Sequence, residues 1–202
     1  AEQLAELGGA PLTNDEFVGA RLYTGPAFEK YNASCRAHVK FEKRDQDGRI
    51  WKQTVPFFVK QFEQKCLGNN YTDTIFAIDR GICKLAEITK ATKLYRGMNG
   101  VVLPSTFLRP EEDSLHHRHC IAGGVEFAFM SATPNMDVAK NYASMKAPGV
   151  LYCIQQGMQD HGANLQPFSQ YSHEDEICFP PLTGLEVERD ADGRANSARN
   201  RR

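Results

Sequence analysis

The sequence predicts an α+β fold, because helical patterns fill the first part of the chain and strand patterns fill the second. Residues 72–89 repeat apolar side chains every three or four positions, which is typical of an amphipathic helix. After residue 93, short β-branched and aromatic segments are separated by Pro and Gly turn signals. This segregation favours the mixed class over an alternating parallel sheet. With 202 residues, 41% of them hydrophobic, the chain can bury one core without disulfide or metal cross-links.

The helical elements are predicted from caps, breaks and periodicity. Residues 14–36 are expected to be helical, with Asn14 or Asp15 as the N-cap and a break at Gly25-Pro26. Residues 45–48 are expected to form a turn. The strongest helix covers 72–89, and its stripe is expected to pack on a sheet; the stripe contains Ile75, Ile78, Ile82 and Leu85.

The second half is expected to be rich in strands. A short helix over 135–143 interrupts them, with Thr133 as its N-cap and Pro134 at its first position. The predicted strands cover 93–96, 125–130, 150–154, 176–179 and 185–188.

We expect one domain with three parts. Residues 1–71 would form an N-terminal helical part, residues 72–188 the catalytic core, and residues 189–202 a disordered tail or linker, because 188–202 nearly lack large apolar side chains. The chain begins with Ala1 and its first methionine is Met98, which suggests a monomeric module taken from a longer protein.

Charge and hydropathy exclude several classes of function. The chain carries 24 Lys and Arg against 25 Asp and Glu, a net charge of -1, so it offers no basic field for nucleic acid. No apolar run approaches the roughly 20 residues that span a bilayer, and the N-terminus lacks a signal-peptide pattern. We therefore expect neither nucleic acid nor a membrane span, and the sequence assigns no compartment.

The six cysteines are scattered singly, without zinc-ribbon spacing. Free buried thiols are favoured over disulfides, although an oxidising compartment would permit some. Residues 116–120 (HHRHC) contain metal-ligating side chains, but the polar segment around them and the lack of a second ligand pair favour a solvated loop. We predict no metal site.

Chemistry-bearing side chains stand at the ends of three predicted strands. Arg96 ends one strand, Ser131 follows the second, and Glu174 and Glu176 precede the third. The two glutamates would share one face if the strand extends back to Glu174, because strand side chains alternate. Taken singly, each has an ordinary explanation: a surface ion pair for Arg96, a cap or turn for Ser131, and a solvated turn for the glutamates. Their common position at strand ends indicates a shared cleft.

These segments resemble the arginine-serine-glutamate class of mono-ADP-ribosyltransferases. The class places an Arg on one strand, a Ser-Thr-Ser-like motif on a second, and Glu-x-Glu ahead of a third. The resemblance runs from about residue 72 to residue 187 and implies two small mixed or antiparallel sheets that form an NAD cleft, with N-terminal helices. The matching segments are Leu94–Gly97, Phe129–Thr133, Tyr171–Pro181 and Leu185–Val187.

The resemblance gives the glutamates their roles. Cleavage of the nicotinamide–ribose bond of NAD creates a sugar cation, so a carboxylate near C1′ is needed more than a general acid. Glu176 is the candidate for this role. An acceptor arginine stays protonated and is a poor nucleophile, so a second carboxylate must orient it and remove its proton. Glu174 is expected to do this.

The other residues would hold the dinucleotide. Arg96 offers a planar cation to the pyrophosphate. The resemblance assigns the Gly97 backbone to the nicotinamide amide, Ser131 to Glu176 and the ribose, and Thr133 to support of the strand end. Ala132 departs from the family pattern by replacing the middle Thr, which removes one hydroxyl.

Three aromatic residues are candidates for recognition, each with an alternative. Residues 156–173 correspond to the loop that recognises the protein substrate, where Phe168 and Tyr171 would be exposed; alternatively they pack this loop against the body. Tyr142 is a candidate to stack on nicotinamide, and packing of its own helix in the core is the alternative.

The sequence therefore predicts an NAD-dependent enzyme that transfers ADP-ribose to arginine on a target protein and releases nicotinamide, without a metal. Two alternatives stay open: an NAD glycohydrolase on the same scaffold, and a catalytically silent binding module. The sequence does not separate a toxin from an internal regulator.

Overall fold

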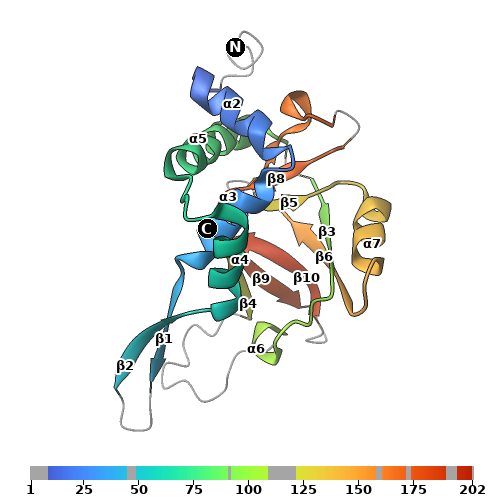
Figure 1. The fold of residues 1–202 in the computed structure, drawn as a ribbon. Coiled ribbons are helices and arrows are strands. Elements are labelled where there is room, and N and C mark those ends of the chain that lie inside the picture. Colours follow the sequence, from blue (N-terminus) through green and yellow to red (C-terminus); the bar gives the residue numbers. More distant parts are fainter. Residues whose placement is uncertain are drawn as a thin grey trace.

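The first half of the chain forms helices and a hairpin, and the second half forms most of the sheets (Figure 1). The computed structural model describes residues 9–44, 49–90, 92–108, 122–157, 161–171, 174–189 and 195–201. The elements before residue 90 are α2 (Asn14–Tyr23), α3 (Phe28–Ala37), β1 (Lys40–Arg44), β2 (Ile50–Thr54), α4 (Pro56–Cys66) and α5 (Thr72–Ile88). Those after it are β3 (Leu94–Asn99), α6 (Ser105–Leu108), β4 (Gly123–Glu126), β5 (Met130–Ala132), α7 (Met136–Ser144), β6 (Gly149–Gln155), β7 (Ala163–Asn164), the 3₁₀ turn η1 (Gln166–Phe168), β8 (Ile177–Phe179), β9 (Thr183–Arg189) and β10 (Ala195–Arg201).

The start of α2 is defined by a reciprocal cap. The Glu16 amide donates to the Thr13 hydroxyl at 3.2 Å, and the Thr13 amide donates to Glu16 Oε2 at 2.8 Å. The N-cap is therefore Thr13, and the prediction of Asn14 or Asp15 was wrong, because the pair Thr13 and Glu16 satisfies two free amides at once. The predicted break is confirmed, since α2 ends before Gly25 and α3 begins after Pro26.

The amphipathic helix α5 confirms the periodicity to within one residue. Ile78, Ile82 and Leu85 are buried on one face, and the helix contacts both α2 and β7. Burial of this stripe ties the N-terminal helices to a sheet, as expected.

The strands in the described part of the chain form three sheets. One has the order β3-β6-β10-β9-β4, in which only the β10–β6 pair is parallel; the second has the order β5-β8-β7 and is antiparallel; the third is the β1–β2 hairpin. An isolated bridge between Tyr95 and Thr133 joins the first two sheets. The hairpin lies within the part predicted to be helical.

The strand predicted over 125–130 is two strands in different sheets. Between them, the Ala128 amide donates to Glu126 Oε1 at 3.1 Å and the Phe129 amide donates to Asn32 Oδ1 at 3.2 Å. Side chains thus replace strand partners for these amides, and the chain leaves one sheet for the other. An apolar run alone does not reveal this change.

Two further predictions were wrong in detail. The cap of α7 is Asn135, whose Oδ1 accepts from the Asp137 and Val138 amides, while Thr133 Oγ1 accepts from the Asn135 amide one step earlier. Residues 195–201 form β10, not a tail, because ladder hydrogen bonds to β9 and β6 engage the backbone and need no apolar sequence.

Alternation along β5 and β8 divides their side chains between two cores. Met130, Ala132, Ile177 and Phe179 pack between the sheets, and Cys178 faces the helices instead. The helix-side core also contains Tyr23, Tyr31, Ile78, Ile82 and Phe129. Ser131 lies opposite Cys178 in the β5–β8 ladder, and Glu176 lies two residues before Cys178, so the backbone directs both side chains to the helix side.

Other predictions are settled more simply. Cys35, Cys66, Cys153 and Cys178 are free thiols. Cys120, the neighbouring histidines and the turn at 45–48 lie outside the described residues. Among the helices that the structure describes, none combines the length and hydrophobicity of a membrane span.

Candidate active site

Arg96 is held in place by both sheets. Strand β3 pairs with β6 along its whole length, with Arg96 opposite Tyr152, and its neighbour Tyr95 exchanges two backbone hydrogen bonds with Thr133. Arg96 Nη1 donates to the Ser131 carbonyl oxygen at 2.5 Å. One guanidinium nitrogen is thus used for anchorage, and the half-buried cation lies beside Ser131.

Ser131 and Glu176 meet across β5 and β8. Ser131 lies opposite Cys178 in the ladder, so Glu176 is its diagonal neighbour on the same face. Ser131 Oγ donates to Glu176 Oε1 at 2.5 Å. The structure therefore brings Arg96, Ser131 and Glu176 together, as the sequence predicted.

Burial raises the pKa of Glu176 above its ordinary value, and the charge of Glu174 raises it further. The Ser131 hydrogen bond and the charge of Arg96 lower the pKa of Glu176, but the effect of burial is larger, so the pKa is raised overall. The carboxylate is thus partly shielded from water. In such a site its charge acts strongly on a nearby developing cation.

Glu174 and Glu176 both precede the first residue of β8. Strand β8 begins at Ile177, and Glu174 is exposed in the preceding segment, where its amide donates to the Tyr171 carbonyl at 3.0 Å. The strand extension assumed from the sequence is therefore absent. The charge of Glu174 nevertheless acts on the Glu176 carboxyl and raises its pKa.

A buried tyrosine contacts Ser131 of the Ser131–Glu176 pair, and it was not predicted from the sequence as a site residue. The Tyr23 hydroxyl lies 3.3 Å from Ser131 Oγ, and Asn32 Nδ2 lies 3.5 Å from the Tyr23 oxygen. Tyr23 and Asn32 are only 1% and 7% exposed. In the sequence, their spacing indicates residues of the helix core. The only sign of a further role is that a hydroxyl and an amide occupy positions expected to be buried, where polar groups need partners.

Gly97 has a packing role that the sequence did not reveal. A Cβ on Gly97 would lie 1.8 Å from the Ala139 carbonyl oxygen, so only glycine lets α7 pack against β3. Tyr142 on α7 is 49% exposed, which contradicts the alternative that it packs in the core. Thr133 supports the strand end through the bridge to Tyr95 and the bond to Asn135.

The two aromatic residues of the predicted recognition loop differ. Phe168 is 8% exposed and packs edge to face on Phe17, with ring centroids 5.6 Å apart. Its predicted exposure was wrong, because η1 turns this side chain into the helix-side core. Tyr171 is 44% exposed.

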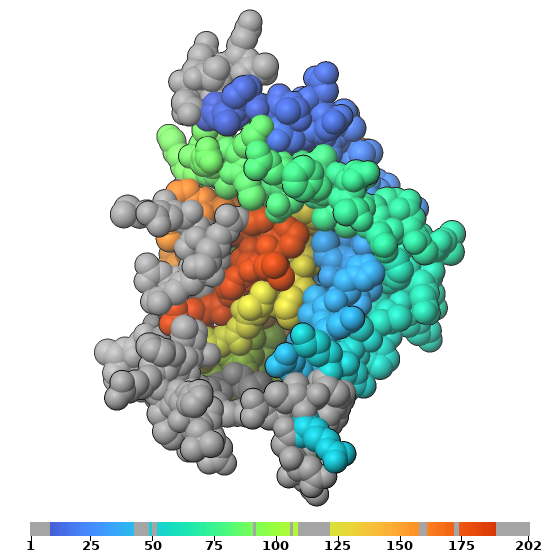
Figure 2. Space-filling model, turned by 90° about the vertical axis from the view of Figure 1, so that its left-hand side faces the viewer, coloured from blue at the N-terminus to red at the C-terminus, as the bar shows by residue number. Residues whose placement is uncertain are grey.

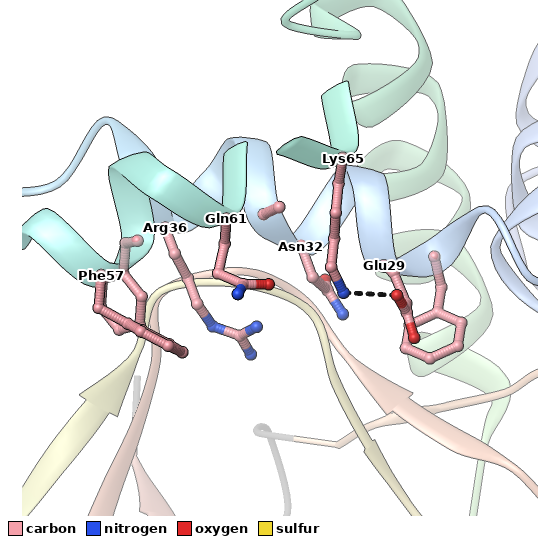
Figure 3. Close-up of a pocket in the computed structure, with 9 residues that line it drawn as sticks. Glu29, Asn32, Arg36, Phe57, Gln61 and Lys65 are labelled. Atoms are coloured by element: carbon pink, nitrogen blue, oxygen red, sulfur yellow. Dashed lines mark hydrogen bonds and ion pairs between the residues drawn. The ribbon is translucent and has the colours of Figure 1, made fainter. Parts of the chain in front are cut away.

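A groove lies between α3 and α4 beside the site (Figure 3). Its volume is about 260 Å³, and its rim carries the Lys65–Glu29 ion pair, 2.5 Å between Nζ and Oε2. Asn32 and Arg36 line it, and through their bonds to the Phe129 amide and Glu126 they connect the groove to the segment that leads into β5. Figure 2 shows the chain segments around β5 and β8, in yellow and red-orange, bordered by α3 and α5 on one face of the molecule.

Comparison with known proteins decides the family. A sequence model described as NAD:arginine ADP-ribosyltransferase matches residues 57–198, more than half of the chain. The chain belongs to this NAD:arginine ADP-ribosyltransferase family. It is an α+β transferase with small, largely antiparallel sheets and N-terminal helices, and the family binds NAD.

Solved structures of ADP-ribosyltransferases share the fold of this transferase. Vis, the toxin from Vibrio splendidus, matches with a TM-score of 0.61 and 18% identity over 95% of this chain and 74% of its own. Exoenzyme S from Pseudomonas aeruginosa gives 0.53 and 16% over 94% and 72%. The eukaryotic mono-ADP-ribosyltransferase ART2.2 gives 0.55 and 12% over 100% and 73%. No curated protein sequence matches.

The residues of the transferase that the structure describes contain no group of three or more His, Cys, Asp or Glu side chains arranged to hold a metal ion.

Proposed function

We propose that this transferase cleaves the nicotinamide–ribose bond of NAD and passes ADP-ribose to an arginine on a target protein, using an arginine-serine-glutamate site. The observation that carries the proposal is the continuous contact from Arg96 through Ser131 to Glu176. A cation, a hydroxyl and a half-buried carboxylate at one place fit the charges of NAD.

Glu176 would stabilise the sugar cation. Ser131 occupies its Oε1 and leaves the second oxygen to accept from the ribose 2′-hydroxyl. The raised pKa of Glu176 has a direct consequence: as the pH falls through it, the carboxylate is protonated and its charge is lost.

Arg96 would bind the pyrophosphate. Its Nη1 is used on the Ser131 carbonyl, which anchors the side chain, and its other N–H donors would bind phosphate oxygens. The Gly97 backbone would bind the nicotinamide amide, and Thr133 would support the end of the strand. Exposed Tyr142 would stack on nicotinamide.

Glu174 would serve the acceptor. It is exposed and stands two residues before Glu176, so a guanidinium bound to it would lie next to the sugar cation and could give up its proton to Glu174 as the bond forms. Tyr171, exposed just before it, would contact the target protein. Vis has been solved with agmatine, an arginine analogue, which supports agmatine as a test acceptor. The mechanism asks for no metal.

The test is incubation with labelled NAD and agmatine, measuring nicotinamide release and ADP-ribosylagmatine separately. Glu174→Gln should reduce agmatine labelling by at least about 100-fold while nicotinamide release persists, because only the acceptor loses its base. Glu176→Gln should remove both activities.

The matched control is Asp175→Asn, which alters an exposed carboxylate between the two glutamates and should leave both activities near wild type. Intact labelling in Glu174→Gln would contradict the assigned role. If the wild type released nicotinamide without labelling agmatine, the protein would be an NAD glycohydrolase. If it released no nicotinamide at high enzyme concentration, it would be a catalytically silent binding module.

A further inference from the structure

Tyr23 is a fully buried residue of α2 whose hydroxyl reaches the functional site from outside the range that the family model matches. We propose that Tyr23, oriented by Asn32, is a positioning residue that directs the single proton of the Ser131 hydroxyl toward Glu176.

The direction of the hydrogen bonds follows from counting donors, beginning at the backbone. The Phe129 amide is a donor, and it lies 3.2 Å from the Asn32 side-chain oxygen. This contact determines which end of the Asn32 amide is oxygen. The Asn32 NH₂ group must therefore face the Tyr23 oxygen, which accepts from it over 3.5 Å.

The same counting continues to the carboxylate. Ser131 has one hydroxyl proton, and an ionised Glu176 can only accept, so this proton lies in the 2.5 Å contact with Oε1. Ser131 Oγ can then only accept in its 3.3 Å contact with Tyr23, and the Tyr23 hydroxyl must donate. The bonds run in one direction, from Asn32 to Tyr23 to Ser131 to Glu176.

A chain of this kind acts on the carboxylate in two ways. Donation from Tyr23 prevents the Ser131 hydroxyl from rotating away and polarises it, which makes it a stronger donor to Glu176. Burial raises the pKa of the Tyr23 hydroxyl well above its ordinary value, so this proton stays in place across the working pH range.

The remaining charged or titratable groups around Glu176 do not supply this bond. Arg96 and Glu174 act on it through their charges, one lowering and the other raising its pKa, and the Cys178 thiol is buried with its pKa raised well above the ordinary value. Cys178 also makes side-chain hydrogen-bond contacts with Ser131 and Tyr23, but its single proton is donated to the Phe179 carbonyl at 3.6 Å. Tyr23 is therefore the donor to the hydroxyl that holds Glu176.

The experiment compares Tyr23→Phe with wild type. The ring, with its contacts to Phe28 and Phe129, is kept, so the denaturation midpoint should stay close to wild type while the donor is lost. Nicotinamide release at saturating NAD should fall roughly tenfold, the equivalent of one hydrogen bond of about 1.4 kcal/mol, with little change in KM. The acid limb of the kcat profile should move to higher pH.

Two more variants separate positioning from simple packing. Asn32→Asp keeps an acceptor for the Phe129 amide, but its second carboxylate oxygen accepts the Tyr23 proton instead of donating to Tyr23. This variant should therefore slow the reaction. In combination with Tyr23→Phe it should add little further loss of rate. Tyr31→Phe is the control, because Tyr31 is a buried tyrosine of the same core that packs on Tyr71. It should leave rate and pH profile unchanged.

The rate readout rests on the proposed function, and a second readout does not. Carbon-13 NMR of labelled glutamate side chains, assigned through Glu176→Gln, follows the titration of Glu176 without NAD. The Glu176 titration should move to higher pH in Tyr23→Phe and stay in place in Tyr31→Phe. An unmoved titration in Tyr23→Phe overturns the positioning role whether or not the wild type cleaves NAD.

Discussion

Ser131 makes three separate contacts in the candidate site. Its carbonyl accepts from Arg96, and its hydroxyl donates to Glu176 while contacting Tyr23. Because the carbonyl belongs to the backbone, a change of side chain at this position leaves the Arg96 anchor intact and alters only the carboxylate side. The cation and the carboxylate are therefore separable by mutation.

Gly97→Ala tests the packing at the neighbouring position. Its Cβ would meet the Ala139 carbonyl oxygen at 1.8 Å, so α7 must move away from β3, and the free energy of unfolding should fall by about 2–3 kcal/mol. Urea denaturation measures it. The control is Gly124→Ala, whose Cβ would lie 3.1 Å from ring atoms of Phe107 and should cost less than about 1 kcal/mol. Equal losses in the two variants would contradict the collision with α7.

At the scale of the element, α2 matters because it delivers Tyr23 to the site. Its first turn is attached to α5 by Glu16, which is buried and bonded to Lys84 at 2.7 Å, with Arg80 at 3.9 Å. Burial alone would raise the pKa of Glu16, but the hydrogen bond and charge of Lys84 together with the Thr13 amide lower it overall. The folded state therefore binds the Glu16 proton less readily than the unfolded chain.

A pH dependence of stability follows for Glu16→Gln. A carboxyl whose pKa is lowered by folding contributes stability that is present above its unfolded pKa and lost as the pH falls through its folded pKa. The variant should be less stable than wild type by about 1–2 kcal/mol at pH 7, and this gap should shrink below about pH 4.5. Urea denaturation at pH 7, 5 and 3.5 measures the gap.

The control for this prediction is Glu42→Gln. Glu42 pairs with Lys52 at 3.7 Å on the exposed hairpin, where solvent screens the pair, so stability should hardly change at any pH. A gap for Glu16→Gln that stays constant from pH 7 to 3.5 would rule out the ion pair as its source.

The elements that the sequence predicted well carry their signal locally. The stripe of α5 and the break before α3 depend on neighbours within one or two turns, and both are confirmed. The strand over 125–130 was misjudged because its division depends on Asn32, almost a hundred residues earlier. Strand β10 was missed for a similar reason, since its partners are distant backbones.

The site shows the same division between local and distant information. That Arg96, Ser131 and Glu176 come together could be predicted, because all three stand at or next to strand ends and the family resemblance groups them. Tyr23 could not, because nothing local to α2 says which sheet its hydroxyl will meet. Phe168 was wrongly expected to be exposed because a loop position does not reveal the direction of a 3₁₀ turn.

At the scale of the whole molecule, the five-stranded sheet depends on its last strand. Strand β10 lies between β6 and β9, so it joins the β3–β6 pair to the β9–β4 pair. Truncation after Arg189 should lower the denaturation midpoint markedly and produce soluble aggregates on gel filtration, because two strand edges lose their partner. A monomeric truncated chain with an unchanged midpoint would show that β10 contributes nothing to the sheet.

The position of β10 also bears on how the protein is made. A ribosome releases β3, β4, β6 and β9 before β10, so the two halves of the sheet can pair internally but cannot join until residues 195–201 emerge. At about 5–20 residues per second, the nascent chain carries two open strand edges until that final step. A catalyst built this way completes its scaffold only when translation of these strands is finished, and chaperone binding during synthesis is expected at β6 and β9.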